Sequence, residues 1–317
     1  MTQGATLDKT STISRLAYVL CKKGPSGYSS ATTSTDVLEH WDGRNKVVIV
    51  TGATSDIGKE CVRAMAAKGA EVIMACRNVN KGEQAMKEIL SRDPVAKLTV
   101  EELDLSSLAS VRRFTLRFLS RQKPLHIVIL NAVVMMCPYL KSQDGHELQF
   151  ATNYLGHFFL TKLLLPRIID TAKKSNNPGR IISVSSSMHF YSYNTVEGPV
   201  RFSDIDSREG YDANWAYGQS KLCNILFARE LQRRMPSDQV IATSVDPGTI
   251  LTDLQRTNLG SKMLMYMGFM FFKNVKQSAA TICYCATAEE VMGGEYYADC
   301  NIQPSSRWSH NALLGKK

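Results

Sequence analysis

Two residues spaced four apart, Tyr217 and Lys221, carry the side chains that proton transfer at an oxygen atom requires. The surrounding apolar pattern predicts a helix over residues 215–235, and this spacing puts the phenol and the ammonium group on one helix face. A free phenol has a pKa of about 10, but a neighbouring cation favours the phenolate and lowers that pKa. The pair therefore predicts an acid–base couple, although the same spacing also occurs on ordinary helix faces.

A serine hydroxyl is a candidate for the same chemistry. The predicted strand at residues 181–184 runs directly into Ser185, Ser186 and Ser187. Ligands of parallel sheets bind at the carboxyl ends of the strands, so one of these hydroxyls could hold the reacting oxygen. The alternative is a serine-rich strand exit without a chemical role.

A glycine-containing turn, from Thr51 to Gly58, joins a predicted buried strand to a predicted helix. Glycine lets the backbone turn sharply beside a pyrophosphate, and the helix amino terminus offers free N–H groups and a positive dipole end. The turn therefore indicates a dinucleotide site. Asp56 takes the place usual for a middle glycine, and its carboxylate is expected to weaken binding without abolishing it.

The end of the second predicted strand, at residues 72–76, indicates which dinucleotide is bound. An NAD(H) enzyme of this type has an acid about 20 residues after the turn, where it bonds the ribose hydroxyls. Here the strand is followed by Arg77. Because a guanidinium pairs well with phosphate, NADP(H) is expected in preference to NAD(H). The alternative is a surface arginine.

Short apolar runs alternate with longer helical patterns, which is typical of βαβ units. Strands are predicted at residues 47–50, 72–76, 98–103, 127–130, 181–184, 240–245 and 295–298, and helices at 57–69, 79–92, 107–121, 145–173 and 215–235. This order predicts an α/β fold, a doubly wound Rossmann-type parallel sheet in a single domain over residues 41–303. A flexible extension is expected over residues 1–40 and a tail over residues 304–317.

Composition excludes several classes of function. The net charge of +9 comes from scattered Lys and Arg residues without a basic stripe, so no nucleic-acid partner is expected. The cysteines form no CxxC pair and have no zinc-ligand spacing, which argues against a metal site and favours a reducing, cytoplasmic compartment. Residues 1–35 are similar in composition to transit peptides and to disordered tails; we favour the tail, with mitochondrial targeting as the alternative.

The apolar segment at residues 263–272 is too short to cross a bilayer, since a spanning helix needs about 18 apolar residues. It could line an apolar pocket or rest on a membrane surface. Peripheral membrane contact and a homodimer are therefore both left open by the sequence.

Taken together, these motifs resemble the short-chain dehydrogenase/reductase family, nearest to the retinol dehydrogenases and the WW-domain-containing oxidoreductases, from about Lys46 to about Asp299. No WW module is expected, because the tryptophans at 41, 215 and 308 are too widely spaced. The resemblance implies hydride transfer between a nicotinamide and a small lipophilic alcohol or carbonyl compound, with a variable lid over residues 250–275. The rival hypothesis is a catalytically weak or inactive NADP(H)-binding scaffold.

The resemblance also assigns catalytic roles. Ser186 would orient the substrate, with Ser185 as a second claimant, and Asn153 would bind the water that leads to the lysine. Lys221 would hold the cofactor ribose and lower the tyrosine pKa. The residues implied to be catalytic are Asn153, Ser186, Tyr217 and Lys221.

Cofactor binding is implied for a longer set of residues. Val133 replaces the glycine usual in the fourth-strand motif, which narrows the space near the cofactor ribose. The residues implied to bind the cofactor are Gly52, Thr54, Ser55, Asp56, Ile57, Gly58, Arg77, Asp104, Leu105, Asn131, Ala132, Tyr217, Lys221, Pro247, Gly248 and Thr252.

Overall fold

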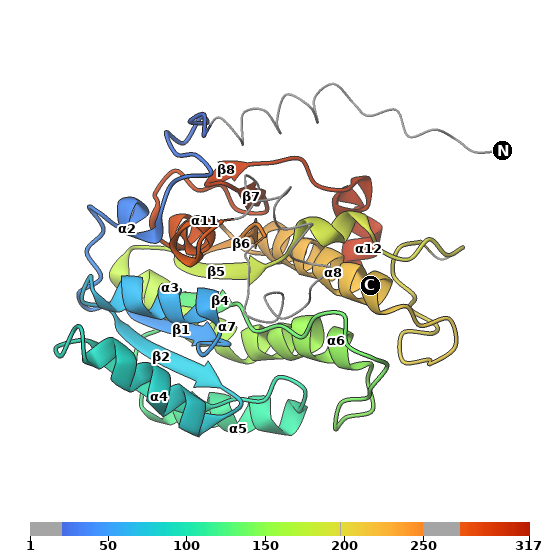
Figure 1. Ribbon diagram of the computed structural model, residues 1–317, viewed down its shortest axis with the longest axis horizontal. Helices are drawn as coiled ribbons and strands as arrows, with labels where there is room; N and C mark the ends of the chain where they lie inside the picture. Colours follow the sequence, from blue (N-terminus) through green and yellow to red (C-terminus); the bar gives the residue numbers. More distant parts are fainter. Residues whose placement is uncertain (1–20, 197, 250–272) are drawn as a thin grey trace, which may run out of the picture.

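A central β-sheet organises the chain in the computed structural model, which describes residues 21–196, 198–249 and 273–317 (Figure 1). Within these residues the sheet has eight strands in the order β3-β2-β1-β4-β5-β6-β7-β8. Strands β1 to β7 pair in parallel, and β8 pairs antiparallel with β7. The strands are β1 Val47–Thr51, β2 Glu71–Cys76, β3 Lys97–Glu102, β4 Ile127–Leu130, β5 Gly179–Val184, β6 Val240–Asp246, β7 Tyr296–Ala298 and β8 Asn301–Ile302.

The doubly wound α/β prediction is confirmed, and all seven predicted strands are present. Strand β8 was not predicted, because two residues are too short for a periodic signal. The strand order reverses between β1 and β4, so their carboxyl ends open a crevice where this type of sheet binds its ligands.

Helices cover both faces of the sheet (Figure 1). Val48 and Val50 pack in one apolar cluster with α3 (Asp56–Ala66), α4 (Val79–Leu90) and α11 (Val275–Thr287). Val47 and Ile49 point the other way, into a cluster with α5 (Leu108–Ser120), α7 (Gly156–Ser175) and α8 (Ala213–Arg234). Burial on both faces explains why β1 shows no polar alternation.

Several helices begin at a side chain that accepts a hydrogen bond from a backbone N–H of the first turn. These capping residues are Ser55 for α3, Asn78 for α4, Ser107 for α5, Asp212 for α8 and Asn274 for α11. The first three follow β1, β2 and β3 closely, so those helices begin at the carboxyl edge of the sheet.

The prediction of one continuous helix over residues 145–173 is wrong, because the structure divides this stretch into separate elements. The structure has a short α6 (Leu148–Phe150), a π-helical turn at Ala151–Leu155, and then α7. A π-helical turn adds one residue to a helical turn, which changes the apolar pattern of the sequence too little to be recognised. Such turns are frequent at functional sites. Helix α11 was also not predicted.

The described residues before β1 and after β8 pack against the rest of the fold, and residues 1–20 lie outside the described residues. The short helix α2 (Ser34–Val37) packs on α3 and α11, the Ser34 hydroxyl donates to Glu60 at 2.6 Å, and Leu38 is 1% exposed. The expected flexible extension over residues 1–40 is therefore wrong for this part of it, because these side chains belong to the core. At the other end, helix α12 (Ala312–Lys316) packs against α8.

Candidate functional site

The turn between β1 and α3 is closed by its own side chains. Gly52 has a φ of +63°, and a Cβ there would lie 2.7 Å from the Cα of Ala132. The Ser55 hydroxyl donates to the Gly52 carbonyl at 2.9 Å and accepts from the Gly58 N–H at 3.2 Å. The predicted phosphate turn is thus a compact loop that opens into the helix amino terminus.

Asn131, directly after β4, holds this turn in place. Its amide nitrogen donates to the Thr51 carbonyl at 3.0 Å and to the Ser55 hydroxyl at 3.2 Å. The side chain is buried, 5% exposed, and lies behind the turn. It therefore supports the turn from β4, and its neighbour Ala132 lines the pocket in front.

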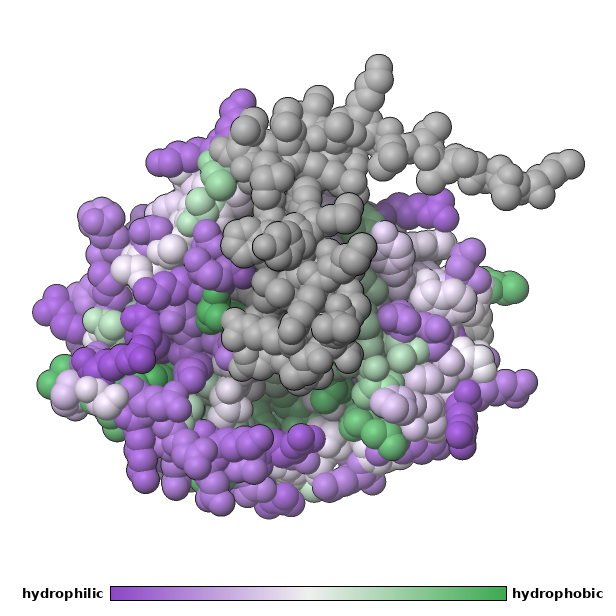
Figure 2. Space-filling view, viewed as in Figure 1, coloured by the Kyte–Doolittle hydropathy of each residue, from purple (hydrophilic) through white to green (hydrophobic). Residues whose placement is uncertain are grey.

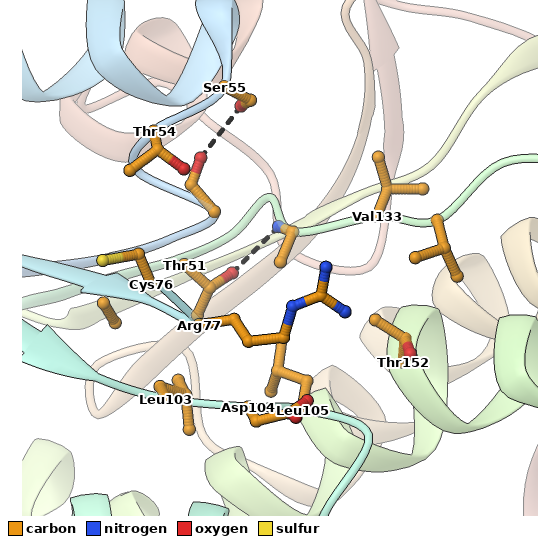
Figure 3. A pocket seen from close by; sticks show the side chains of 14 residues that line it. Thr51, Thr54, Ser55, Cys76, Arg77, Leu103, Asp104, Leu105, Val133 and Thr152 are labelled. Carbon is orange, nitrogen blue, oxygen red and sulfur yellow. Dashed lines mark hydrogen bonds between the residues drawn. The ribbon is translucent and has the colours of Figure 1, made fainter. Parts of the chain in front are cut away.

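A pocket with a volume of about 200 Å³ lies in front of the turn, at the carboxyl ends of β1 to β4 (Figure 3). Its wall is formed by Thr51, Gly52, Thr54, Ser55, Ala75, Cys76, Arg77, Leu103, Asp104, Leu105, Ala132, Val133, Val134 and Thr152. Seven of the predicted cofactor residues are in this wall. Thr51, Ala75, Cys76, Leu103, Val134 and Thr152 were not predicted individually, although each lies in or next to a predicted motif, and Val133 was predicted to narrow the space near the cofactor ribose.

Arg77 and Asp104 approach the pocket from neighbouring strands. Figure 3 shows the Arg77 side chain extending from the end of β2 towards the middle of the pocket. One Asp104 oxygen accepts from the N–H and the hydroxyl of Ser106, at 2.9 and 2.6 Å. Arg77 therefore brings a positive charge to the pocket, and Asp104 is held in place by its own loop.

Asp56 does not line this pocket. It is the exposed first residue of α3 and lines a second pocket, between α3 and α4, together with Lys59 and Arg63. A carboxylate in the first turn of a helix also interacts favourably with the helix dipole. The side chain of the neighbouring Ile57, predicted to bind the cofactor, packs against the core, and its binding role stays a prediction.

Tyr217 and Lys221 lie together on α8, as the spacing predicted. The Lys221 nitrogen is 5.5 Å from the centre of the Tyr217 ring and donates to the Val184 carbonyl at 2.9 Å. Both side chains are buried, 6% and 2% exposed. A Cβ at Gly218 would overlap the backbone oxygen of Tyr191, so glycine allows α8 to pack this closely against the loop after β5.

The two serines that follow β5 point in different directions. The Ser185 hydroxyl is buried and donates to the Lys221 carbonyl at 2.8 Å. The Ser186 hydroxyl is half-buried and accepts from the Met188 N–H at 3.2 Å. Ser186 is therefore the serine available beside Tyr217, whereas Ser185 is used in packing the strand against α8.

Burial controls the protonation of the pair. Desolvation lowers the pKa of Lys221 to about 7, and the Asp246 carboxylate partly opposes this. Desolvation raises the pKa of Tyr217, Asp246 adds to the rise, and a hydrogen bond with Ser186 opposes it. The expected lowering of the tyrosine pKa by Lys221 is not found in the protein alone, because both groups have lost their water.

Asn153, in the π-helical turn, connects the pocket to α8. Its side-chain oxygen accepts from the Val134 N–H at 2.8 Å, and its amide donates to the Ser220 hydroxyl at 3.0 Å. The side chain is completely buried. The predicted catalytic residues and the predicted cofactor pocket therefore adjoin each other across Asn153.

Asp246, at the end of β6, directly precedes the predicted Pro247-Gly248 pair but was not itself assigned a role. Its carboxylate accepts from the Ser187 N–H at 2.7 Å, the Gly248 N–H at 2.8 Å and the Tyr296 hydroxyl at 3.1 Å. It thus joins the loop after β5 to the Pro247-Gly248 turn. The predicted Thr252 and the lid segment at residues 263–272 lie outside the described residues.

The described ranges contain neither a metal-ligand cluster nor a membrane-spanning helix. No set of three or more His, Cys, Asp or Glu side chains there is arranged to hold a metal ion. No helix of the described ranges is both long enough and apolar enough to cross a membrane.

Comparison with known protein sequences gives consistent results. Residues 46–197 match the family model described as short chain dehydrogenase. The chain is 42% identical over 301 residues to the Brassica napus short-chain dehydrogenase TIC 32 B, chloroplastic, covering 93% of each chain. It is 41% identical over 267 residues to retinol dehydrogenase 12 of Homo sapiens, covering 83% of this chain and 81% of that one.

Solved structures show the same fold. An uncharacterised protein of Mycobacterium paratuberculosis superposes with a TM-score of 0.69 at 30% identity, covering 90% of this chain and 94% of its own. The Pseudomonas aeruginosa RhlG/NADP active-site complex superposes with a TM-score of 0.63 at 20% identity, covering 81% and 95%. The second similarity extends to the fold alone.

Proposed function

This chain belongs to the short-chain dehydrogenase family, and from that premise we propose that it interconverts a lipophilic alcohol and its aldehyde or ketone with NADP(H). Membership makes it an oxidoreductase that acts on CH–OH groups with a nicotinamide dinucleotide. The observation that carries the specific proposal is the buried pair of Tyr217 and Lys221 beside Ser186, next to the pocket.

The residues around the pocket fit a dinucleotide. The turn at Gly52 approaches Ala132 so closely that a Cβ would fill the space between them, and α3 begins at the pocket wall. When bound, the nicotinamide would supply or accept a hydride at the substrate carbon. Phosphates would lie at the turn and at the amino terminus of α3.

The acid–base work falls to three side chains. The Tyr217 hydroxyl gives its proton to the substrate oxygen in reduction and takes one from it in oxidation. Ser186 donates a hydrogen bond to the same oxygen. Lys221, when charged, stabilises the tyrosinate that reduction leaves, and Asn153 holds the adjoining wall at Val134.

NADP(H) is proposed over NAD(H) because of Arg77. Its guanidinium extends into the pocket at the end of β2 (Figure 3), where a preference for NAD(H) would call for an acid. A positive charge there suits the extra phosphate of NADP(H).

A lipophilic substrate is proposed because apolar side chains are exposed at the carboxyl edge of the sheet. Met135 and Leu140 follow β4, Phe190 follows β5, and Trp215 lies in the first turn of α8; they are 53%, 52%, 53% and 51% exposed. Figure 2 shows hydrophobic side chains below the middle of this view and at its left and right edges, within a largely hydrophilic surface. Retinoid, steroid, polyisoprenoid and long-chain aldehydes all fit this description. Peripheral membrane contact, a homodimer and a cytoplasmic location stay predictions.

The test is a turnover screen of lipophilic aldehydes and ketones with NADPH, followed by loss of absorbance. Tyr217→Phe is expected to reduce turnover by at least about a hundredfold while NADPH affinity stays within about threefold, because only the proton donor is removed. Tyr297→Phe is the matched control, since Tyr297 is similarly buried and, among the described residues, its hydroxyl bonds only to Met292. Unchanged turnover in Tyr217→Phe would refute the assignment, and NADPH binding without any turnover would favour a scaffold.

A further inference from the structure

His157 is a buried titratable residue that the proposed mechanism leaves unused. It lies in the first turn of α7 and is 2% exposed. Its Nε2 is 2.8 Å from the Thr51 hydroxyl of the phosphate turn, and its Nδ1 is 3.0 Å from the backbone oxygen of Asn153. One imidazole thus touches both the cofactor turn and the π-helical turn.

The two partners determine which nitrogen carries the proton. A carbonyl oxygen can only accept, so Nδ1 of His157 is the donor to Asn153. Nε2 is then the acceptor, and the Thr51 hydroxyl donates to it. Burial lowers the pKa of His157 to about 4, so the ring is neutral near neutral pH and keeps one donor and one acceptor.

The chain of hydrogen bonds continues on both sides of the ring. The Thr51 oxygen accepts from the N–H groups of Asn131 and Ala132, at 2.9 and 3.0 Å, the second of which is drawn in Figure 3. On the other side, the Asn153 amide donates to the Ser220 hydroxyl at 3.0 Å.

Ser220 completes the connection to the acid–base pair. Its hydroxyl donates to the Tyr217 carbonyl at 2.7 Å. An unbroken series of buried contacts therefore links Thr51, His157, Asn153, Ser220 and Tyr217. In sequence these residues are spread over three separate elements, β1, the π-helical turn with α7, and α8.

We propose that His157 is a positioning residue that couples the cofactor turn at Thr51 to the placement of Asn153 and, through Ser220, of the acid–base tyrosine. The inference rests on the proposed function, because it assigns the same site an internal link between cofactor binding and catalysis. Its two hydrogen bonds have separable effects. The bond to Thr51 shapes the turn that meets the cofactor, and the bond to Asn153 shapes the turn that meets α8.

The test uses substitutions that each keep one of these bonds. The His157→Gln side chain puts an oxygen near the position of Nε2, so it keeps an acceptor for Thr51 and loses the donor to Asn153. The His157→Asn side chain puts an amide near the position of Nδ1, so it keeps the donor and loses the acceptor. His157→Phe keeps a ring of similar size and loses both bonds.

The readouts are the NADPH dissociation constant from cofactor fluorescence, and kcat and KM for the best substrate. We expect His157→Asn to weaken NADPH binding about tenfold with kcat retained within about threefold. His157→Gln should lower kcat about tenfold with NADPH affinity retained, and His157→Phe should show both losses. Uniform losses in all three variants, or no loss in any, would overturn the proposal.

His126 provides the matched control. It is also a partly buried histidine whose pKa is lowered to about 4, and its Nδ1 accepts from the Val47 N–H at the opposite end of β1. His126→Phe is expected to lower the melting temperature while NADPH affinity and kcat stay within about threefold of wild type. If NADPH affinity or kcat changed in His126→Phe as it does in the His157 variants, the effect would not be specific to the hydrogen bonds of His157.

A nitrogen-15 spectrum of the imidazoles tests the link without turnover. The wild-type His157 ring is expected to be neutral with its proton on Nδ1 between pH 6 and 8, and an Nε2–H ring would overturn the proposal. If NADPH binds but no substrate turns over, the proposed function fails. The difference in NADPH affinity between His157→Asn and His157→Gln still tests the hydrogen bond between His157 and Thr51. If NADPH does not bind at all, the ring tautomer alone decides.

Discussion

At the scale of single residues, the cost of burying charge explains why the site holds its reactive groups in unusual states. Lys221 is completely surrounded by protein and has the Val184 carbonyl as a hydrogen-bond acceptor. An ammonium group in that position has lost most of its water, and the Asp246 carboxylate only partly compensates. The lysine therefore changes its charge near neutral pH, where a proton relay is useful.

This burial makes stability depend on pH in a defined direction. The pKa of Lys221 is about 7 in the folded protein and 10.5 in its ordinary state. Between these values the unfolded chain binds more protons, so the contribution of Lys221 to the free energy of unfolding rises with pH. The free energy of unfolding of Lys221→Met, relative to that of wild type, should therefore be highest at pH 7. This difference should fall by on the order of 3 kcal/mol between pH 7 and pH 10.

Chemical denaturation at pH 7, 8.5 and 10 measures this difference. Lys173→Met is the control, because Lys173 is exposed on α7 and should leave the pH dependence unchanged. A difference between Lys221→Met and wild type that stays constant with pH would contradict the lowered pKa.

The proposed preference for NADP(H) also depends on one residue, Arg77. Arg77→Ala should weaken NADPH binding about tenfold or more and leave NADH binding within about twofold, since the lost charge would face only the extra phosphate. Fluorescence titration with both cofactors measures the ratio. Exposed Arg92, which lines the second pocket, is the control as Arg92→Ala. Equal losses for the two cofactors would show that Arg77 does not discriminate between them.

At the scale of elements, the turn from β1 to α3 does two jobs with one hydroxyl. Ser55 caps α3 by accepting from the Gly58 N–H, and it also accepts from the Asn131 amide that ties the turn to β4. The same atom therefore stabilises the helix and shapes the pocket wall.

Ser55→Ala should lower the free energy of unfolding by about 1 kcal/mol and weaken NADPH binding severalfold. Ser107 caps α5 in the same way but does not line the pocket, so Ser107→Ala should cost a similar amount of stability without changing NADPH affinity. Urea denaturation and cofactor titration separate the two effects. Equal affinity changes in the two variants would mean that the cap alone, and not its place in the wall, is responsible.

At the scale of the whole molecule, the segment before the first strand is part of the core. Leu38 is 1% exposed in the same apolar cluster as α3 and α11, and the Tyr28 ring meets Tyr284 of α11 edge-on at 5.7 Å. This segment packs on α3 and α11, which lie on the same face of the sheet. It therefore contributes to the stability of α3, the helix that follows the predicted phosphate turn.

Leu38→Ala should therefore lower the free energy of unfolding by about 2–5 kcal/mol, the usual cost of a cavity in a packed core. Leu116→Ala is the control, since Leu116 is 61% exposed and should change stability by about 0.5 kcal/mol or less. Thermal and urea unfolding measure both. A loss at Leu38 no greater than at Leu116 would return the segment to the flexible extension that its composition predicted.

Much of the fold could be predicted because the relevant signals are local. Buried strands such as residues 127–130 are continuous apolar runs, and helix starts such as Ser55 have side chains that cap their own first turn. The spacing of Tyr217 and Lys221 is likewise a property of one helix. These features depend on near neighbours in the chain, so the sequence by itself was sufficient to predict the sheet, the glycine-containing turn after β1 and the placement of Tyr217 beside Lys221.

The tertiary structure decided what depends on neighbours that are far apart in sequence. Which of Ser185 and Ser186 faces Tyr217 follows from the packing of β5 against α8, and Asp56 lines the second pocket, between α3 and α4, and not the first. The raised pKa of Tyr217 and the link through His157 likewise depend on water excluded by several elements at once. Desolvation and side-chain direction are set by the assembled core, so no local pattern contains them.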